Sequence, residues 1–141
     1  MVEDFCRALK FVRSTDWQNK LKLSKLQLKM SIIKLKKSII PSCDVGSLEK
    51  LGKLVKSTCS IKGIGGYKIG FELVIPFGMD KVVKTVRKIT KLPIIYDHQK
   101  AGTDIPEMGE KFMETCKLAD AVVLFPQAGP ETEVAWIKAA Q

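Results

Sequence analysis

Residues 92–106 read LPIIYDHQKAGTDIP, and this order of residue types is the most informative pattern in the chain. The first five residues are apolar and predict a buried strand. Two carboxylates and one ammonium group follow at Asp97, Lys100 and Asp104, and Pro106 is well placed to open a helix. Because charged groups are costly to bury, a fold that gathers three of them at a strand end is expected to use them chemically.

From Ser38 onward, short apolar runs alternate with helical patterns. Strands are predicted at 38–44, 64–73, 92–96 and 121–125. Ser47 is a candidate N-cap for a helix whose apolar face holds Leu48, Leu51, Leu54 and Val55. A second helix is predicted after Asp80 (Val82, Val83, Val86, Ile89), a third from Pro106 (Met108, Phe112, Cys116) and a fourth from Gly129-Pro130 (Val134, Ala135, Ile137, Ala140).

This βαβαβαβα order predicts a parallel sheet with right-handed crossovers. The sheet is expected to be either an open doubly wound sheet or half of a barrel. A dinucleotide-binding turn is discounted, since only Gly46 follows the first strand and the glycines at 63–70 precede the second strand or lie within it. Polar residues at three successive strand ends favour the barrel, whose active site is built there. The predicted fold class is therefore α/β, a parallel (β/α)4 half of a TIM-type (β/α)8 barrel over residues 38–141.

The composition, with 45% hydrophobic and 28% charged residues in 141, is typical of one soluble globular domain. Four scattered cysteines and a single histidine disfavour a disulfide framework or a zinc site, and they indicate a reducing, cytoplasmic setting. No apolar run approaches the roughly 20 residues of a membrane helix, and no secretion signal is evident.

The formal net charge of +9 is unevenly distributed. Residues 1–37 hold ten Lys/Arg against three acidic residues, whereas residues 38–141 hold fourteen against twelve. Residues 1–37 are therefore interpreted as a basic, poorly ordered extension, with Met30 as a possible natural start. The alternative is a leader that binds RNA or an acidic membrane surface; the remainder of the chain is not expected to bind nucleic acid or a membrane.

Four patterns, taken in order, resemble the orotidine 5'-phosphate decarboxylase family over residues 38–141. They are Asp44 at the end of the first strand, Lys68 in YKIGFEL, Asp97 with Lys100 and Asp104-Ile105-Pro106, and the strand that follows Asp120. The resemblance implies a cofactor-free and metal-free decarboxylation of orotidylate to UMP, a step of pyrimidine biosynthesis. It also implies a homodimer in which Asp104 and Ile105 act across the subunit interface.

The resemblance implies a role for each residue. Lys100 would oppose the carbanion and protonate it as general acid, with Asp97 orienting it near the departing carboxylate. Asp44 and Lys68 would position the ribose, and Gln127 either contacts substrate or only shapes its turn. Structural interpretations remain beside these: Asp44 as a favourable charge near a helix N-terminus, Lys68 as a surface residue, and Asp104 as a helix cap. His98 is interpreted as a lone structural histidine, and Phe112 and Trp136 as core residues.

The spacing departs from the family pattern. The family has Asp-x-Lys-x-x-Asp, whereas each gap here is one residue longer. Residues three apart in a regular strand face opposite sides, so Lys100 joins Asp97 only if the strand bulges or has already ended. Otherwise Gln99 takes the place beside Asp97.

Three further interpretations complete the prediction. A barrel of this type takes about 250 residues, so the chain is interpreted as a truncated product with little activity alone. The related metal-dependent ketogulonate-phosphate decarboxylases and hexulose-phosphate synthases are an alternative, with Glu72 replacing Lys68 if the register shifts. A non-enzymatic module that binds nucleic acid or membranes through its basic leader is the second alternative.

Overall fold

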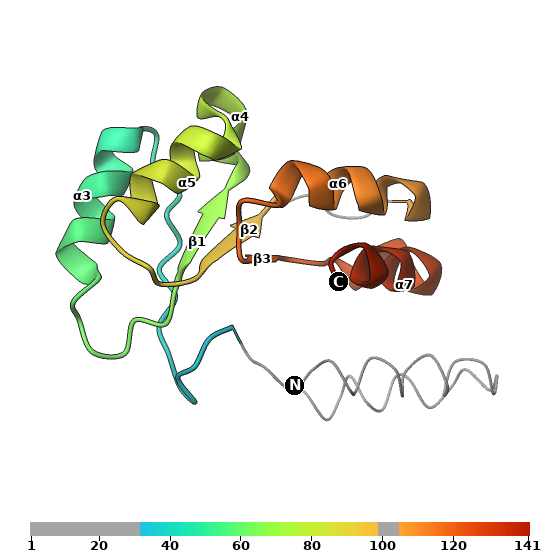
Figure 1. Cartoon of the computed structure of the whole chain (residues 1–141), viewed down its shortest axis with the longest axis horizontal. Coiled ribbons are helices and arrows are strands. Elements are labelled where there is room, and N and C mark those ends of the chain that lie inside the picture. Colours follow the sequence, from blue (N-terminus) through green and yellow to red (C-terminus); the bar gives the residue numbers. More distant parts are fainter. Residues whose placement is uncertain (1–31, 99–104) are drawn as a thin grey trace. The chain divides into compact units, whose positions relative to one another are not determined.

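The computed structural model of the chain describes residues 32–98 and 105–141 (Figure 1). The chain divides into two units, Met1–Ser31 and Ile32–Gln141, so most of the predicted basic extension lies outside the described residues. Residues 32–37 contain no helix or strand. Among the residues described, no helix is long and apolar enough to cross a membrane.

Three parallel strands form a sheet in the order β1 (Tyr67–Gly70), β2 (Ile94–Asp97) and β3 (Ala121–Val122). The helices between and around them are α3 (Leu48–Thr58), α4 (Phe71–Phe77), α5 (Met79–Arg87), α6 (Gly109–Cys116) and α7 (Pro130–Ala139). Short 3-10 turns, η2 (Pro106–Met108) and η3 (Pro126–Ala128), precede the last two helices. The predicted alternation of strands and helices is confirmed, as are the Ser47 cap and the buried faces of α3 and α5.

The helices that bury the sheet do so from one face. Tyr67, Ile69, Ile94 and Tyr96 alternate along β1 and β2 and are buried in a core with side chains of α3, α5 and α6. The intervening residues Lys68, Ile95 and Asp97 lie outside that core and are only half-buried. A doubly wound sheet is covered on both faces, whereas a barrel segment is covered on its outer face alone. The prediction of a partial TIM-type barrel is therefore confirmed, and the doubly wound alternative is rejected.

The predicted first strand, 38–44, is reduced to two isolated parallel bridges, from Ile39 to Ile64 and from Ser42 to Lys68. Ile39 and Cys43 donate backbone hydrogen bonds toward the β1 side, and Pro41 accepts one there from Lys68 N at 3.0 Å. Pro41 thus faces the paired side of the segment, and its missing N–H interrupts the ladder.

Gly65 and Gly66 allow the chain to bulge between the two bridges, where three residue steps on one side oppose four on the other. A Cβ at Gly65 would lie 2.6 Å from the Cβ of Ser38, and one at Gly66 would lie 2.8 Å from the carbonyl oxygen of Pro93. Only glycine permits backbones to approach this closely.

The predicted second strand, 64–73, is wrong at its C-terminal end, because Phe71–Leu73 begin helix α4. Leu73 is fully buried and Val74 and Phe77 pack against the core, which is helical spacing, while Phe71 and Ile75 are exposed. A short run that is apolar except for Glu72 does not distinguish these two periods.

Two predictions near the C-terminus need correction. The fourth strand shortens to Ala121–Val122, although Val123 N still donates to Tyr96 O at 2.9 Å. Helix α7 begins at Pro130 as predicted, but it buries Thr132 and Trp136 and leaves Ile137 and Ala140 exposed. Trp136 takes over the burial because its ring packs against Phe112 at a centroid distance of 4.6 Å.

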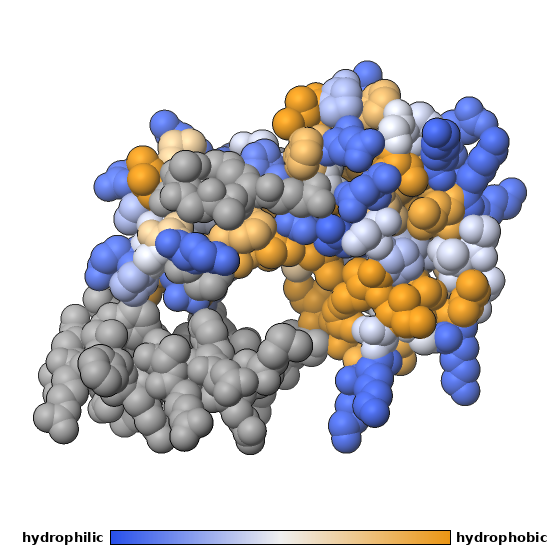
Figure 2. Space-filling model, turned by 180° about the vertical axis from the view of Figure 1, so that it is seen from behind, coloured by the Kyte–Doolittle hydropathy of each residue, from blue (hydrophilic) through white to orange (hydrophobic). Residues whose placement is uncertain are grey.

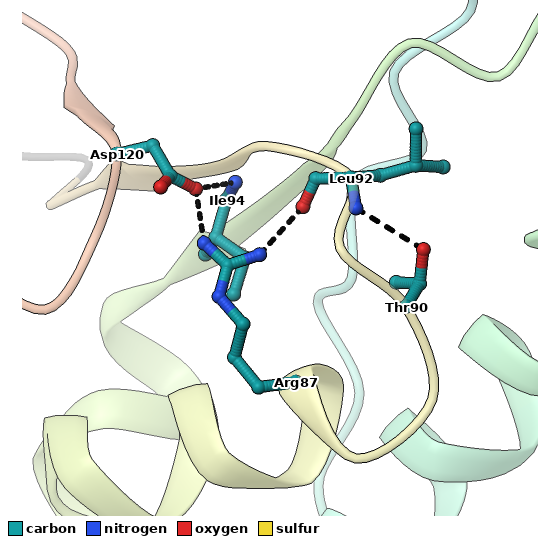
Figure 3. Close-up of polar contacts among 5 residues, drawn as sticks. All are labelled: Arg87, Thr90, Leu92, Ile94 and Asp120. Carbon is teal, nitrogen blue, oxygen red and sulfur yellow. Dashed lines mark hydrogen bonds and ion pairs between the residues drawn. The ribbon is translucent and has the colours of Figure 1, made fainter.

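A charged clamp joins α5 to the start of β2 and β3 (Figure 3). The Arg87 guanidinium donates to the Leu92 carbonyl at 2.8 Å and forms an ion pair with Asp120. The same Asp120 oxygen accepts from the backbone N–H of buried Ile94 at 2.6 Å. Asp120 therefore satisfies a buried donor at the N-terminal edge of the sheet.

We expect Asp120→Ala to lower the free energy of unfolding by about 1–3 kcal/mol, because the Ile94 N–H loses its side-chain acceptor inside the protein. Asp80→Ala is the matched control, since it removes an exposed carboxylate paired with Lys84 one helical turn away. The control should cost about 0.5 kcal/mol or less. Urea unfolding midpoints give both values, and equal shifts would show that the clamp is no more than a surface ion pair.

Candidate functional site

The face of the sheet opposite the described helices carries the candidate site, at the C-terminal ends of its strands. Lys68 on β1 lies beside Ile95 on β2 and opposite Ser42 on the other side, while Gly70 lies opposite Asp97. Asp44 follows directly after Cys43, whose backbone N–H bonds to Lys68 O at 2.8 Å. Strand pairing therefore brings Asp44, Lys68 and Asp97 together from three segments.

Lys68 lies between the two carboxylates. Its Nζ donates to Asp97 Oδ2 at 3.0 Å and lies 3.7 Å from Asp44 Oδ2. The side chains of Lys68 and Asp97 are 21% and 15% exposed, and that of Asp44 is 33% exposed. These three side chains are exposed enough for a ligand to reach them and buried enough for their charges to interact strongly.

The pairing holds Lys68 in its charged form. Burial by itself lowers the pKa of Lys68, but the hydrogen bond to Asp97 and the charges of Asp44 and Asp97 outweigh it, so the pKa is raised above its ordinary value of 10.5. Burial, followed by the charge of Asp44, raises the pKa of the neighbouring Cys43 thiol to about 11, which Lys68 only partly opposes. The thiol is therefore protonated at neutral pH and unsuited to act as a nucleophile.

An alternating row of carboxylate, ammonium and carboxylate offers both acceptors and donors to a polyhydroxylated ligand. Two carboxylates at this distance from one cation also form a fixed dipolar array, which is suited to stabilising charge that develops nearby. Lys68 itself occupies the space between Asp44 and Asp97, so a metal ion shared by these two carboxylates would have to displace it. Within the described parts of the chain, no group of three His, Cys, Asp or Glu side chains could hold a metal ion.

Two predicted catalytic residues, Lys100 and Asp104, lie outside the described residues, as does the alternative Gln99. The end of β2 at Asp97 is relevant to whether Lys100 can share a site with Asp97. His98 lies outside the strand, so strand alternation does not require Lys100 to face away from Asp97.

The other sequence-predicted residues have clear positions. Ile105 is exposed, and its carbonyl oxygen accepts a hydrogen bond from Trp136 Nε1 at 3.0 Å. Gln127 is exposed in η3. Glu72 lies in the first turn of α4, so the register shift that would put it in place of Lys68 does not occur.

His98 was expected to be structural, and its contacts agree. Its Nδ1 and the hydroxyl of Tyr96 are joined by a 2.5 Å hydrogen bond, and its ring meets Phe112 edge-on at 5.9 Å. Burial, with smaller contributions from Cys116 and Asp97, raises the pKa of Tyr96 to about 12, so the hydroxyl stays protonated.

Two features of the site were not found from the sequence. Ser42 lies on the strand row of Lys68, and its position two residues before Asp44 is a period-two signal that could have revealed it. Tyr96 supports the site from behind, because its ring stacks on Phe112 of α6 at 6.1 Å while the next residue, Asp97, faces Lys68. The alternation of Tyr96 and Asp97 in the sequence carries that information.

A solved structure with a similar fold is the orotidine 5'-monophosphate decarboxylase from Methanocaldococcus jannaschii complexed with the inhibitor BMP. The similarity has a TM-score of 0.65 and 24% sequence identity, and it covers 74% of this chain and 47% of that one. At this identity the comparison establishes the fold, and the chain spans less than half of the length of that decarboxylase. No protein-family model matches the sequence, and the comparison with curated proteins finds no match.

We expect Lys68→Met to lower the free energy of unfolding by about 1–2 kcal/mol at pH 7, because Asp44 and Asp97 lose the cation between them. A raised pKa means that Lys68 stabilises the fold below its unfolded-state pKa and ceases to do so as pH rises through its folded-state pKa. The difference in the free energy of unfolding between wild type and variant should therefore become smaller above about pH 10.5.

Urea unfolding at pH 7 and near pH 11 tests this expectation. Lys84→Met is the matched control, since Lys84 pairs with Asp80 at 2.8 Å on an exposed helix surface. The control should change stability by about 0.5 kcal/mol or less at pH 7. The assigned pairing would be contradicted if Lys68→Met changed the free energy of unfolding as little as Lys84→Met does. It would also be contradicted if the effect of Lys68→Met were the same at both pH values.

Proposed function

We propose that this chain carries the catalytic strands of an orotidine 5'-phosphate decarboxylase-like enzyme, acting without cofactor on orotidylate. One observation carries the proposal: Lys68 lies between Asp44 and Asp97 on the open face of a half-barrel, at the strand ends where such folds build active sites. These residues follow one another along the chain in the order of the decarboxylase motifs, and the fold is similar to part of a solved decarboxylase.

In this proposal, loss of carbon dioxide from the pyrimidine leaves an electron pair on the ring carbon. Lys100 stabilises that carbanion and then transfers its proton to it, forming UMP. Asp97 orients Lys100, and the Asp44–Lys68 pair binds the ribose hydroxyls. Asp104 and Ile105 act in the site of a second subunit.

The metal-dependent decarboxylases and synthases of the same fold fit less well, because Lys68 places a cation where their acidic ligand would stand. The matched part corresponds to 47% of the solved decarboxylase. Loops that grip the phosphate follow strands seven and eight of a barrel, and binding energy from remote groups of the substrate lowers the barrier to reaction.

We expect the 141-residue chain alone to turn over orotidine 5'-phosphate at a barely measurable rate, and a complex with a homologous C-terminal half-barrel to turn it over readily. The loss of substrate is followed by its ultraviolet absorbance. Comparable rates with and without the second half would contradict the assignment of substrate binding to that half. No turnover in a folded complex, with or without magnesium, would argue for another phosphorylated substrate.

In the same complex, Lys100→Ala should lower kcat by about 10²–10⁴-fold, since the general acid is lost. Lys91→Ala is the control, because Lys91 is exposed just before β2, at the end of the sheet opposite the site. An unchanged kcat in Lys100→Ala would transfer the catalytic role to another residue, with Gln99 or Lys68 as the next to test.

A further inference from the structure

The sheet has two outer segments, and each has a partner on one side only within the described residues. Residues 39–43 pair with the β1 segment, and β3 pairs with β2. β1 and β2 are paired on both sides. Exposed strand edges of this kind readily recruit another strand.

The backbone shows which groups face outward. Ile39, Pro41 and Cys43 bond toward β1, so the peptide groups of Ile40 and Ser42 face the opposite side. Val123 N bonds to Tyr96 O, so Val122 and Leu124 face away from β2. Among the described residues, these outward groups have no backbone partner. As far as the described residues show, both edges therefore offer free donors and acceptors.

Helix α7 also lacks part of the surface on which such a helix normally packs. A crossover helix packs over the strand that it follows and the next strand of the sheet. α7 follows β3, beyond which no strand lies in the described part of the chain, and its Ile137 is 39% exposed. Between α6, β3 and the end of α7 the surface is hollowed, with a volume of about 390 Å³ lined in part by Cys116, Ala121 and Ala139.

The opposite edge of the sheet offers an apolar side chain that could cover α7. Ile39 is 65% exposed, and Ile61 near its paired segment is also exposed. The space-filling view, which shows the molecule from behind, has apolar surface gathered in its lower part, next to hydrophilic side chains (Figure 2).

We propose that two copies of this chain close one eight-stranded barrel, with β3 of each copy pairing with residues 39–43 of the other. A two-fold axis along the strand direction keeps all strands parallel and uses both edges of both copies, so no free edge remains. In this arrangement α7 of one copy covers Ile39 of the other. Lys68 and Ile95, which face outward from an isolated sheet, then line the barrel interior.

A second copy suits these edges better than an unrelated chain, because each copy carries one edge of each kind. This inference rests on the strand edges and on the exposed apolar residues beside them, and it does not depend on the proposed reaction.

Sedimentation equilibrium on the full chain tests it. Wild type should be a dimer at micromolar concentration. Ile39→Lys and Ile137→Lys should each weaken self-association by about 100-fold, because every dimer contains the change twice and loses buried apolar surface each time. Ile75→Lys is the matched control, since Ile75 is 70% exposed on α4, away from both edges, and should leave the dimer unchanged. Circular dichroism checks that each variant is folded.

Hydrogen exchange supplies the second measurement. Amides of residues 40, 42, 122 and 124 should become at least about 10-fold more protected on going from a dilute to a concentrated sample. A monomer at all concentrations would overturn the inference, and so would a dimer that Ile75→Lys dissociates while Ile39→Lys does not. A dimer with the expected edge protection but no turnover of orotidylate would support the inference and count against the proposed function.

Discussion

Tyr67, Ile69, Ile94 and Tyr96 alternate along two neighbouring strands, and their burial beneath the helices forces every intervening residue onto the other face of the sheet. Each such side chain contributes about 1.5–3 kcal/mol through the apolar surface it buries. A shift of one residue in either strand would exchange the two faces and place Lys68 or Asp97 in the core. The position of the candidate site therefore follows from the burial of its neighbours.

The charges on the open face are stabilised by one another. Lys68 is less than one quarter exposed, and without Asp44 and Asp97 its burial would favour the neutral amine. The two carboxylates would in turn repel each other without Lys68. Loss of any one of the three charges would therefore destabilise the other two. Together they hold one cation and two anions on a face that a ligand can reach.

One-sided covering also accounts for the incomplete edges. A sheet whose helices lie on one face leaves its other face open until the strands close on themselves. Residues 39–43 and β3 are the two ends of this partial barrel, and the exposed Ile39 and Ile137 lie at those ends. The same geometry thus explains an accessible charged site and the surface that we assign to a second copy.

Local pattern in the sequence was sufficient for several elements. Ser47 and the spacing of Leu51 and Val55 predicted α3, and the valines of α5 were read correctly as its buried face. The sequence was insufficient where long-range contacts compete with local preference. Phe71–Phe77 is apolar except for Glu72, so its local pattern does not distinguish a strand from a helix, and the structure begins helix α4 directly after Gly70. Trp136 displaces Ile137 from the buried face because Phe112, far away in sequence, offers it a stacking partner.

The sequence by itself predicted the parallel α/β order and favoured the partial barrel, because the periods of apolar residues are a local property of the chain. It offered Asp44, Lys68 and Asp97 as candidates through their strand-end positions and the family resemblance of the motifs around them. Only the tertiary structure decided that these three side chains meet, that Pro41 and the Gly65–Gly66 bulge break the first strand into two bridges, and that the helices of the core cover a single face of the sheet. Each of these depends on the register between segments distant in sequence. Register is set by pairing and packing across the sheet, and no single segment contains that information.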